Sequence, residues 1–219
     1  MQNEQSARIP AGETILDGGL FTPTEPAGIV LFAHGSGSSR FSPRNRHVAG
    51  VLQSAGLATL LMDLLTWEEE QVDALTAHLR FDIGLLAERL VYATKWARQQ
   101  QSTADLRIGY FGSSTGGGAA LVAAAELPAE VGAVVSRGGR PDLAGDALPK
   151  VKAPTLLIVG GEDHVVIDLN EQARAQMKCE CKIDIVSGAT HLFEEPGALE
   201  QVAKLASDWF VKHISPRTK

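Results

Sequence analysis

The chain has 219 residues, of which 44% are hydrophobic and 21% are charged, close to the average of globular proteins. This composition excludes an intrinsically disordered chain, because it supplies enough apolar side chains for a core. The formal net charge of −6 argues against a broad nucleic-acid-binding surface. No apolar run approaches the ~18–20 residues of a membrane span, and Met1–Gln5 does not resemble the start of a signal peptide.

The two cysteines, Cys179 and Cys181, are too few for a disulfide framework or for a zinc site of their own. We interpret them as small reduced side chains of the core. Together with the lack of a leader sequence, they predict a cytoplasmic protein that does not enter a membrane.

Short apolar runs alternate along the chain with stretches of helical character. Most runs are continuously hydrophobic, which is typical of strands in a parallel sheet that is covered on both faces. The predicted strands are residues 28–33, 57–62, 106–111, 133–136, 155–159 and 182–186. The predicted helices are residues 42–56, 82–101, 115–127, 168–177 and 196–213.

This alternation predicts an α/β fold, a doubly wound and mostly parallel sheet with helices on both faces. Because the sequence contains no internal repeat or linker, we expect a single domain over residues 1–219, with a core of about 12–213. Sites in such sheets lie beyond the carboxyl ends of the strands. The residues directly after each apolar run are therefore the candidates for function.

The run 106–111 is followed by Gly112-Ser113-Ser114-Thr115-Gly116, a G-x-S-x-G pattern. A nucleophilic serine at a sharp strand-to-helix turn has strained backbone angles, and glycine on both sides allows that turn to form. The N-terminus of the following helix also favours developing negative charge. The pattern predicts Ser114 as a nucleophile, with an ordinary glycine-rich turn as the alternative.

A serine hydroxyl needs a base, and His191 lies on the loop after the last apolar run. Asp163 follows the run 155–159 and is predicted to orient that base. The chain order Ser114, Asp163, His191 is the order of an α/β-hydrolase triad. Asp142, which follows the run 133–136, and Glu162 remain alternative acids.

A glycine-rich loop, residues 34–39, follows the first apolar run. Such a loop can direct a backbone N–H at the oxygen of a reacting carbonyl, and we assign this donor to Ser36. The second donor is predicted to be the N–H of Thr115, the residue after the nucleophile. We interpret His34 as a structural histidine that bonds the loop, and Asp63 as a carboxylate that caps or pins a loop.

On these residues the sequence resembles the dienelactone hydrolase family of α/β-hydrolases, most of all the branch found alone or fused to phosphoribosyltransferase domains. The resemblance extends over about residues 28–210. It is carried by the segments FAHGSGSSRFSPRN (32–45), GYFGSSTGGGAAL (109–121), VVSRGGRPDLAG (134–145), PTLLIVGGEDHVV (154–166) and GATHLFEEPGAL (188–199).

The resemblance implies the α/β-hydrolase fold, a Ser or Cys nucleophile, an Asp, a His and no cofactor. The enzyme that names the family carries cysteine at the nucleophile position, where this chain has Ser114. This departure favours general esterase chemistry over the hydrolysis of dienelactone itself. The segment between residues 136 and 154 is too short for the large lid domains that this fold often inserts there, so we expect an open site.

Three residues are candidates for substrate binding. Arg137 and Arg40 follow strand ends, where a guanidinium can hold a substrate carboxylate; an ion pair within the protein is the alternative. Trp67 either lines the pocket or covers the edge of the sheet. We therefore predict a serine carboxylesterase or lactonase that cleaves small esters without a cofactor or metal and without nucleic-acid or membrane partners. A non-catalytic or regulatory binding module that retains the fold is the alternative.

Overall fold

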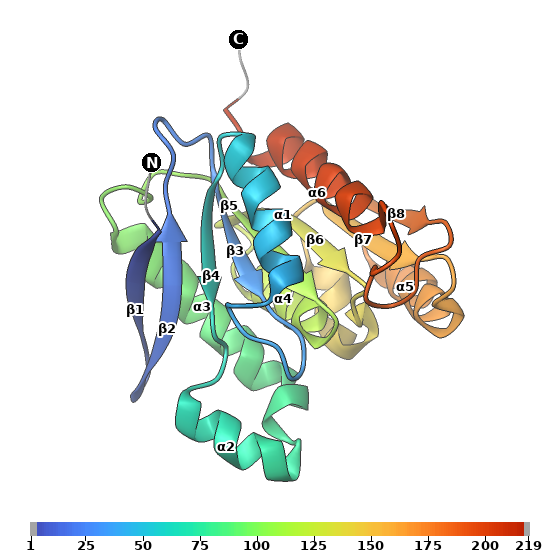
Figure 1. The fold of residues 1–219 in the computed structure, drawn as a ribbon, viewed down its shortest axis with the longest axis horizontal. Helices are drawn as coiled ribbons and strands as arrows, with labels where there is room; N and C mark the ends of the chain where they lie inside the picture. The colour runs from blue at the N-terminus through green and yellow to red at the C-terminus, as the bar shows by residue number, and fades with distance from the viewer. Residues whose placement is uncertain (1–3, 217–219) are drawn as a thin grey trace.

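The computed structural model describes residues 4–216 of the chain, and across them eight strands form one sheet (Figure 1). The strands are β1 (Gln5–Ala11), β2 (Thr14–Phe21), β3 (Ile29–Ala33), β4 (Ala58–Met62), β5 (Ile108–Ser113), β6 (Val131–Arg137), β7 (Thr155–Gly160) and β8 (Cys181–Val186). Their order in the sheet is β1-β2-β4-β3-β5-β6-β7-β8. All neighbours from β4 to β8 pair in parallel, whereas β1 and β2 are antiparallel, so the predicted mostly parallel sheet is confirmed.

Helices cover both faces of the sheet, as the doubly wound arrangement predicts (Figure 1). One core cluster packs α3 and α4 against the sheet, and the other packs α1 and α6 against its opposite face. The helices are α1 (Pro43–Ser54), α2 (Trp67–Thr76), α3 (Ile83–Gln99), α4 (Thr115–Glu126), α5 (His164–Gln176) and α6 (Ala198–Ile214), with the 3₁₀ helices η1 (Leu79–Phe81) and η2 (Pro141–Lys150). Only η2 lies between β6 and β7, so that segment carries no large lid.

The N-terminal hairpin is a correction to the sequence analysis, which placed the start of the core near residue 12. Strand β1 pairs with β2 from Gln5 onward, and its alternate side chains, among them Ala7 and Ile9, are buried. A strand that is covered on one face alternates buried and exposed residues. A search for continuous apolar runs misses such a strand.

Helix α2 is a second correction, because no helix was predicted over Trp67–Thr76. It projects beyond the carboxyl ends of the strands (Figure 1) and buries no apolar face, with Trp67 72% and Leu75 90% exposed. Its start carries a capping box in which Thr66 and Glu69 exchange side-chain and backbone hydrogen bonds. The capping residues, not hydrophobic periodicity, are the signal for this helix.

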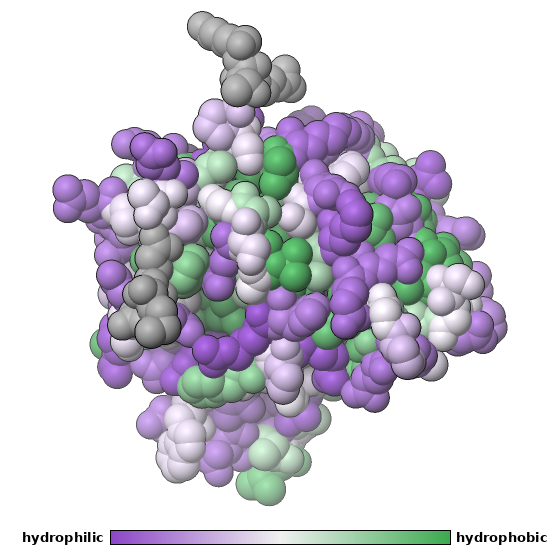
Figure 2. Space-filling model, turned by 45° about the horizontal axis from the view of Figure 1, so that its top comes forward, coloured by the Kyte–Doolittle hydropathy of each residue, from purple (hydrophilic) through white to green (hydrophobic). Residues whose placement is uncertain are grey.

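The surface is largely hydrophilic on the face that Figure 2 shows, with smaller hydrophobic areas between the polar residues. In the described residues 4–216, no helix is long and apolar enough to cross a membrane, and no His, Cys, Asp and Glu side chains cluster as a metal site. Cys179 and Cys181 are free but only partly buried, so the expected core position is wrong in part: Cys181 begins the edge strand β8.

Candidate active site

Ser114 occupies the turn between β5 and α4 with backbone angles φ 50° and ψ −121°. These angles are strained for a residue with a side chain, and such strain is concentrated at functional sites. A Cβ atom on Gly112 would lie 2.4 Å from the carbonyl oxygen of Gly116, and one on Gly116 would lie 2.2 Å from that of Ala33. The two glycines are therefore required because the helix backbone passes directly against the sheet.

His191 contacts one carboxylate among the described residues. Its Nδ1 lies 2.6 Å from Oδ2 of Asp163, the N-cap residue of α5. The alternative acid Asp142 instead bonds Nε and Nη2 of Arg140, at 2.8 and 2.7 Å, and Glu162 is exposed. The structure thus brings Asp163, and neither alternative, to the predicted base.

Ser114 and His191 border the same backbone segment, which follows β6. The N–H of Ser114 donates to the carbonyl of Arg137 at 3.3 Å, and a Cβ on the next residue, Gly138, would lie 3.6 Å from Cε1 of His191. Among the residues described, the Ser114 hydroxyl has no hydrogen-bond partner. Catalytic hydrogen bonds are often long or absent before substrate binds, so a free Ser114 hydroxyl is compatible with its predicted role.

The loop after β3 is fixed by His34, whose buried ring bridges two backbone segments. Nε2 accepts the N–H of Leu64 at 2.9 Å, which leaves Nδ1 to donate to the carbonyl of Gly35 at 3.0 Å. Burial lowers the pKa of His34, so the neutral ring that this pattern requires is favoured. The predicted structural role of His34 is confirmed. The loop also passes close to Ser114, because a Cβ on Gly35 would lie 3.0 Å from the Cβ of Ser114.

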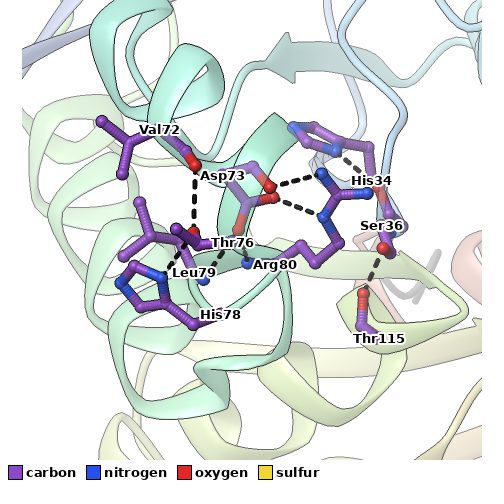
Figure 3. A network of polar contacts seen from close by, with 10 residues as sticks. His34, Ser36, Val72, Asp73, Thr76, His78, Leu79, Arg80 and Thr115 are labelled. Atoms are coloured by element: carbon purple, nitrogen blue, oxygen red, sulfur yellow. Dashed lines mark hydrogen bonds and ion pairs between the residues drawn. The ribbon is translucent and has the colours of Figure 1, made fainter.

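The N–H of Ser36, predicted as an oxyanion donor, donates to Oγ1 of Thr115 at 3.1 Å (Figure 3). Behind this pair, Arg80 lines a small cavity together with His34 and Ser36. Figure 3 shows the Arg80 side chain directed at Asp73, a buried carboxylate that also accepts the N–H of Arg80 at 3.1 Å. Sequence analysis missed Arg80 because it lies in the segment around α2, for which no structure was predicted.

A groove with a volume of about 1250 Å³ lies between the β1–β2 hairpin, the loop after β3 and the start of α2. Trp67 lines it, as does Gly37 of the loop after β3, whereas the three side chains of the predicted triad lie outside it. Arg40 also lines the groove, but it forms an ion pair with Asp63, whose carboxylate accepts the N–H of Arg40 at 2.7 Å as well. Asp63 therefore pins this loop, as predicted.

Arg137 lies outside the groove, at the carboxyl end of β6, and is only 7% exposed. Its guanidinium carbon is 5.9 Å from the centre of the Phe193 ring. Its Nε and Nη1 have no hydrogen-bond partner within residues 4–216. Arg137 therefore does not line the groove, and it forms no ion pair within residues 4–216.

Comparison with known proteins places these observations in a family. The sequence profile of the dienelactone hydrolase family matches residues 16–214. A dienelactone hydrolase from Anabaena variabilis, whose crystal structure is known, is 63% identical, and the match covers 98% of this chain and 100% of that chain with a TM-score of 0.96.

Two Mycobacterium tuberculosis proteins that are named as phosphoribosyl transferases are 60% identical over 211 residues. The match covers 96% of this chain but 47% of theirs, so the chain spans about half the length of these curated relatives. The structure of Est1E from Butyrivibrio proteoclasticus has 17% identity and a TM-score of 0.79, with 94% of this chain and 98% of that chain covered. This more distant similarity shows a shared fold alone.

Proposed function

Because this chain belongs to the dienelactone hydrolase family, we propose that it hydrolyses small carboxylic esters or lactones through an acyl-enzyme on Ser114. The main support is the arrangement at the carboxyl ends of β5, β7 and β8. A strained turn exposes Ser114, and His191, held by Asp163 at 2.6 Å, borders the same backbone segment. The name of the Anabaena relative, at 63% identity, is consistent with ester or lactone hydrolysis.

In the proposed reaction, Oγ of Ser114 attacks the carbonyl carbon while Nε2 of His191 takes the hydroxyl proton. Asp163 holds the Nδ1–H of His191, which fixes the tautomer and stabilises the ring when it becomes charged. The tetrahedral intermediate expels the alcohol, which receives the proton from His191. A water molecule, deprotonated by the same ring, then attacks the acyl carbon and releases the acid with regeneration of the Ser114 hydroxyl.

The N–H groups of Ser36 and Thr115 are the proposed donors to the carbonyl oxygen of the substrate. The Thr115 N–H is at the first turn of α4, where no intrahelical acceptor is present. The Ser36 N–H donates to the Thr115 hydroxyl in the free protein, so the substrate must replace that hydroxyl as acceptor. An oxyanion is a stronger acceptor than a hydroxyl, so this exchange favours the transition state over the free enzyme.

The groove beside the loop after β3 is the proposed site for the rest of the substrate. Trp67 presents an exposed ring along it, and Arg40 contributes the edge of its guanidinium while it pairs with Asp63. The absence of a large lid between β6 and β7 in the described chain supports an open site for small esters. We assign Trp67 and Arg40 to substrate contact. We do not assign Arg137 to it, because a substrate carboxylate would have to extend beyond the groove to reach Arg137.

Two measurements test the proposal together. We expect turnover of p-nitrophenyl acetate, and stoichiometric labelling by a fluorophosphonate that mass spectrometry of peptides assigns to Ser114. Labelling without turnover would indicate a reactive turn with an incomplete triad. The absence of both labelling and turnover would instead support the regulatory binding module.

A further inference from the structure

Arg137 is the one strongly buried cation in the described chain for which the structure shows no acceptor. Two of its nitrogens, Nε and Nη1, are inaccessible to solvent and have no hydrogen-bond partner among residues 4–216. Burial lowers its pKa to about 10, a value at which the guanidinium still carries its charge at neutral pH. By contrast Arg89, which is equally buried, bonds Glu69 at 2.7 Å.

The charged side chain that acts on Arg137 carries the same sign. Arg44, from α1, lowers the pKa of Arg137 further by repulsion, and no carboxylate within the described residues offsets this. Arg44 reaches Glu194 with Nη1, at 2.9 Å, but its own Nε is also buried without a partner. Two guanidinium groups thus contact the same loop through Phe193 and Glu194, and three of their buried nitrogen atoms have no hydrogen-bond partner in the described residues.

Such an arrangement is costly in an empty protein. Removing an ion from water costs several kcal/mol unless a counter-charge and hydrogen bonds replace the water. The ring of Phe193, with its centre 5.9 Å from the guanidinium carbon, offers Arg137 a weak attraction and accepts no conventional hydrogen bond. A small negative ion would supply both the charge and the acceptors that are missing.

We propose that Arg137 and Arg44 bind a small monovalent anion, such as chloride or formate, beneath the loop that carries His191. The ligand must be small, because Arg137 is only 7% exposed and lies outside the groove. Arg44 does line the groove, so an ion has a route to the site past its side chain. Positive charge and N–H donors would recognise a free ion and the carboxylate of a substrate in the same way. The experiment below therefore has to distinguish these two sources of the anion.

The proposed anion site contacts the loop after β8, which carries His191, through two consecutive residues of that loop. Phe193 packs on Arg137, and Glu194 bonds Arg44, two and three residues after His191. The residue after Arg137 is Gly138, and a Cβ atom placed on Gly138 would lie 3.0 Å from the carbonyl oxygen of His191. An anion that holds the two arginines in place should therefore stabilise the histidine loop as well as the protein.

Thermal unfolding tests the site without relying on hydrolysis, so its outcome is independent of the proposed function. The buffer is HEPES at pH 7.5, with ionic strength held by the sodium salt of MES, whose anion is too large for the site. Replacement of MES by chloride or formate should raise Tm saturably, on the order of 5 °C at one hundred times Kd. Arg137→Met should lose this response, and in MES alone its Tm should equal or exceed that of the wild type, because an unpaired buried charge is gone.

Matched variants separate the site from general charge effects. Arg46→Met removes an exposed arginine of the same helix as Arg44, one that pairs with Glu4, and should respond like the wild type. Arg44→Met should fold and weaken the anion response by at least about tenfold in Kd, as expected for one charge-assisted bond. This second variant keeps the test decisive if Arg137→Met does not fold.

Three results would overturn the proposal. The first is a wild-type Tm that neither chloride nor formate changes. The second is an Arg137→Met or Arg44→Met variant that responds as strongly as Arg46→Met. The third is a KM that rises in Arg137→Met only for an ester with a free carboxylate, while free ions leave Tm unchanged; the site would then belong to the substrate.

Discussion

Two loops approach Ser114, and they are held in different ways. The loop after β3 is tied by three buried or partly buried polar contacts: His34 bonds Leu64, Asp63 bonds Arg40, and Ser36 bonds Thr115. The loop after β8 carries a histidine side chain that is 40% exposed and has one carboxylate partner, Asp163. The loop of the proposed oxyanion donors is thus held at several points, whereas the proposed base, His191, is partly exposed and has fewer contacts.

This difference fits what each loop has to do in the proposed reaction. Donors to an oxyanion act best when they are already oriented before the charge develops. A base that serves two proton transfers needs alignment at each step, and in the free protein it is not yet bonded to Ser114. Substitutions on the two sides should therefore fail differently, one through geometry and the other through proton transfer.

The largest effect should come from Ser114→Ala, which removes the group that both loops serve. We expect kcat for p-nitrophenyl acetate to fall by about 10⁴–10⁶-fold, as nucleophile removal does in serine hydrolases. Folding should be unchanged, as judged by circular dichroism and Tm. A purified variant that retains more than about a tenth of the wild-type rate would show that another residue is the nucleophile.

The next largest effect should come from Asp163→Asn, on the side of the histidine loop. The amide cannot stabilise the charged ring of His191 and permits the wrong tautomer, so kcat should fall by about 10²–10⁴-fold. The matched control is Asp142→Asn, because Asp142 also follows a strand but bonds Arg140. The reverse ranking of the two variants in steady-state kinetics would transfer the role of the acid to Asp142.

The parallel part of the fold was predictable because most of its strands are buried on both faces. Every side chain of β3, β4, β5 and β7 is buried, and such strands appear in a sequence as continuous apolar runs. The hairpin was not predicted, since β1 buries only alternate and mostly small residues. Helix α2 has no buried apolar stripe, and hydrophobic periodicity cannot reveal a helix whose stability comes from its cap and charges.

The same reasoning explains which site residues the sequence could supply. Ser114, Asp163 and His191 each follow a strand, and parallel strands bring their carboxyl ends to one edge, so position alone predicts that they lie near one another. The structure contains the contact between Asp163 and His191. The engagement of the Ser36 N–H by Thr115 depends on a side-chain rotamer, which no pattern encodes. Likewise, the lack of a counter-charge for Arg137 depends on three-dimensional neighbours, because several carboxylates lie near it in the sequence.

A smaller effect is expected on the side of the loop after β3. Asp63→Asn weakens the ion pair with Arg40 and should let the loop move, and a displacement of ~1 Å costs on the order of 10²-fold in rate. We therefore expect kcat to fall by about 10–100-fold with little change in KM. The control is Asp208→Asn, an exposed partner of Lys204 on α6, which should retain the wild-type kcat. A rise in KM at constant kcat would mean that Asp63 acts only through the substrate contact of Arg40 and does not position the loop.

The smallest effect concerns the pH dependence that His34 imparts to this loop. Burial lowers the pKa of His34 in the folded protein, so between that value and the unfolded pKa of about 6.5 the unfolded chain binds more protons. The contribution of His34 to stability is therefore fully present above about pH 6.5 and is lost as the pH falls. Tm of the wild type should decrease between pH 7.5 and 5, by about 2–4 °C for each kcal/mol lost.

His34→Gln should have a lower Tm at pH 7.5 but a shallower decrease of Tm with falling pH. His47→Gln, at an exposed position of α1, should keep the wild-type slope. Equal slopes in all three proteins would show that protonation of His34 is not linked to folding, and that the bonds to Leu64 and Gly35 survive in acid.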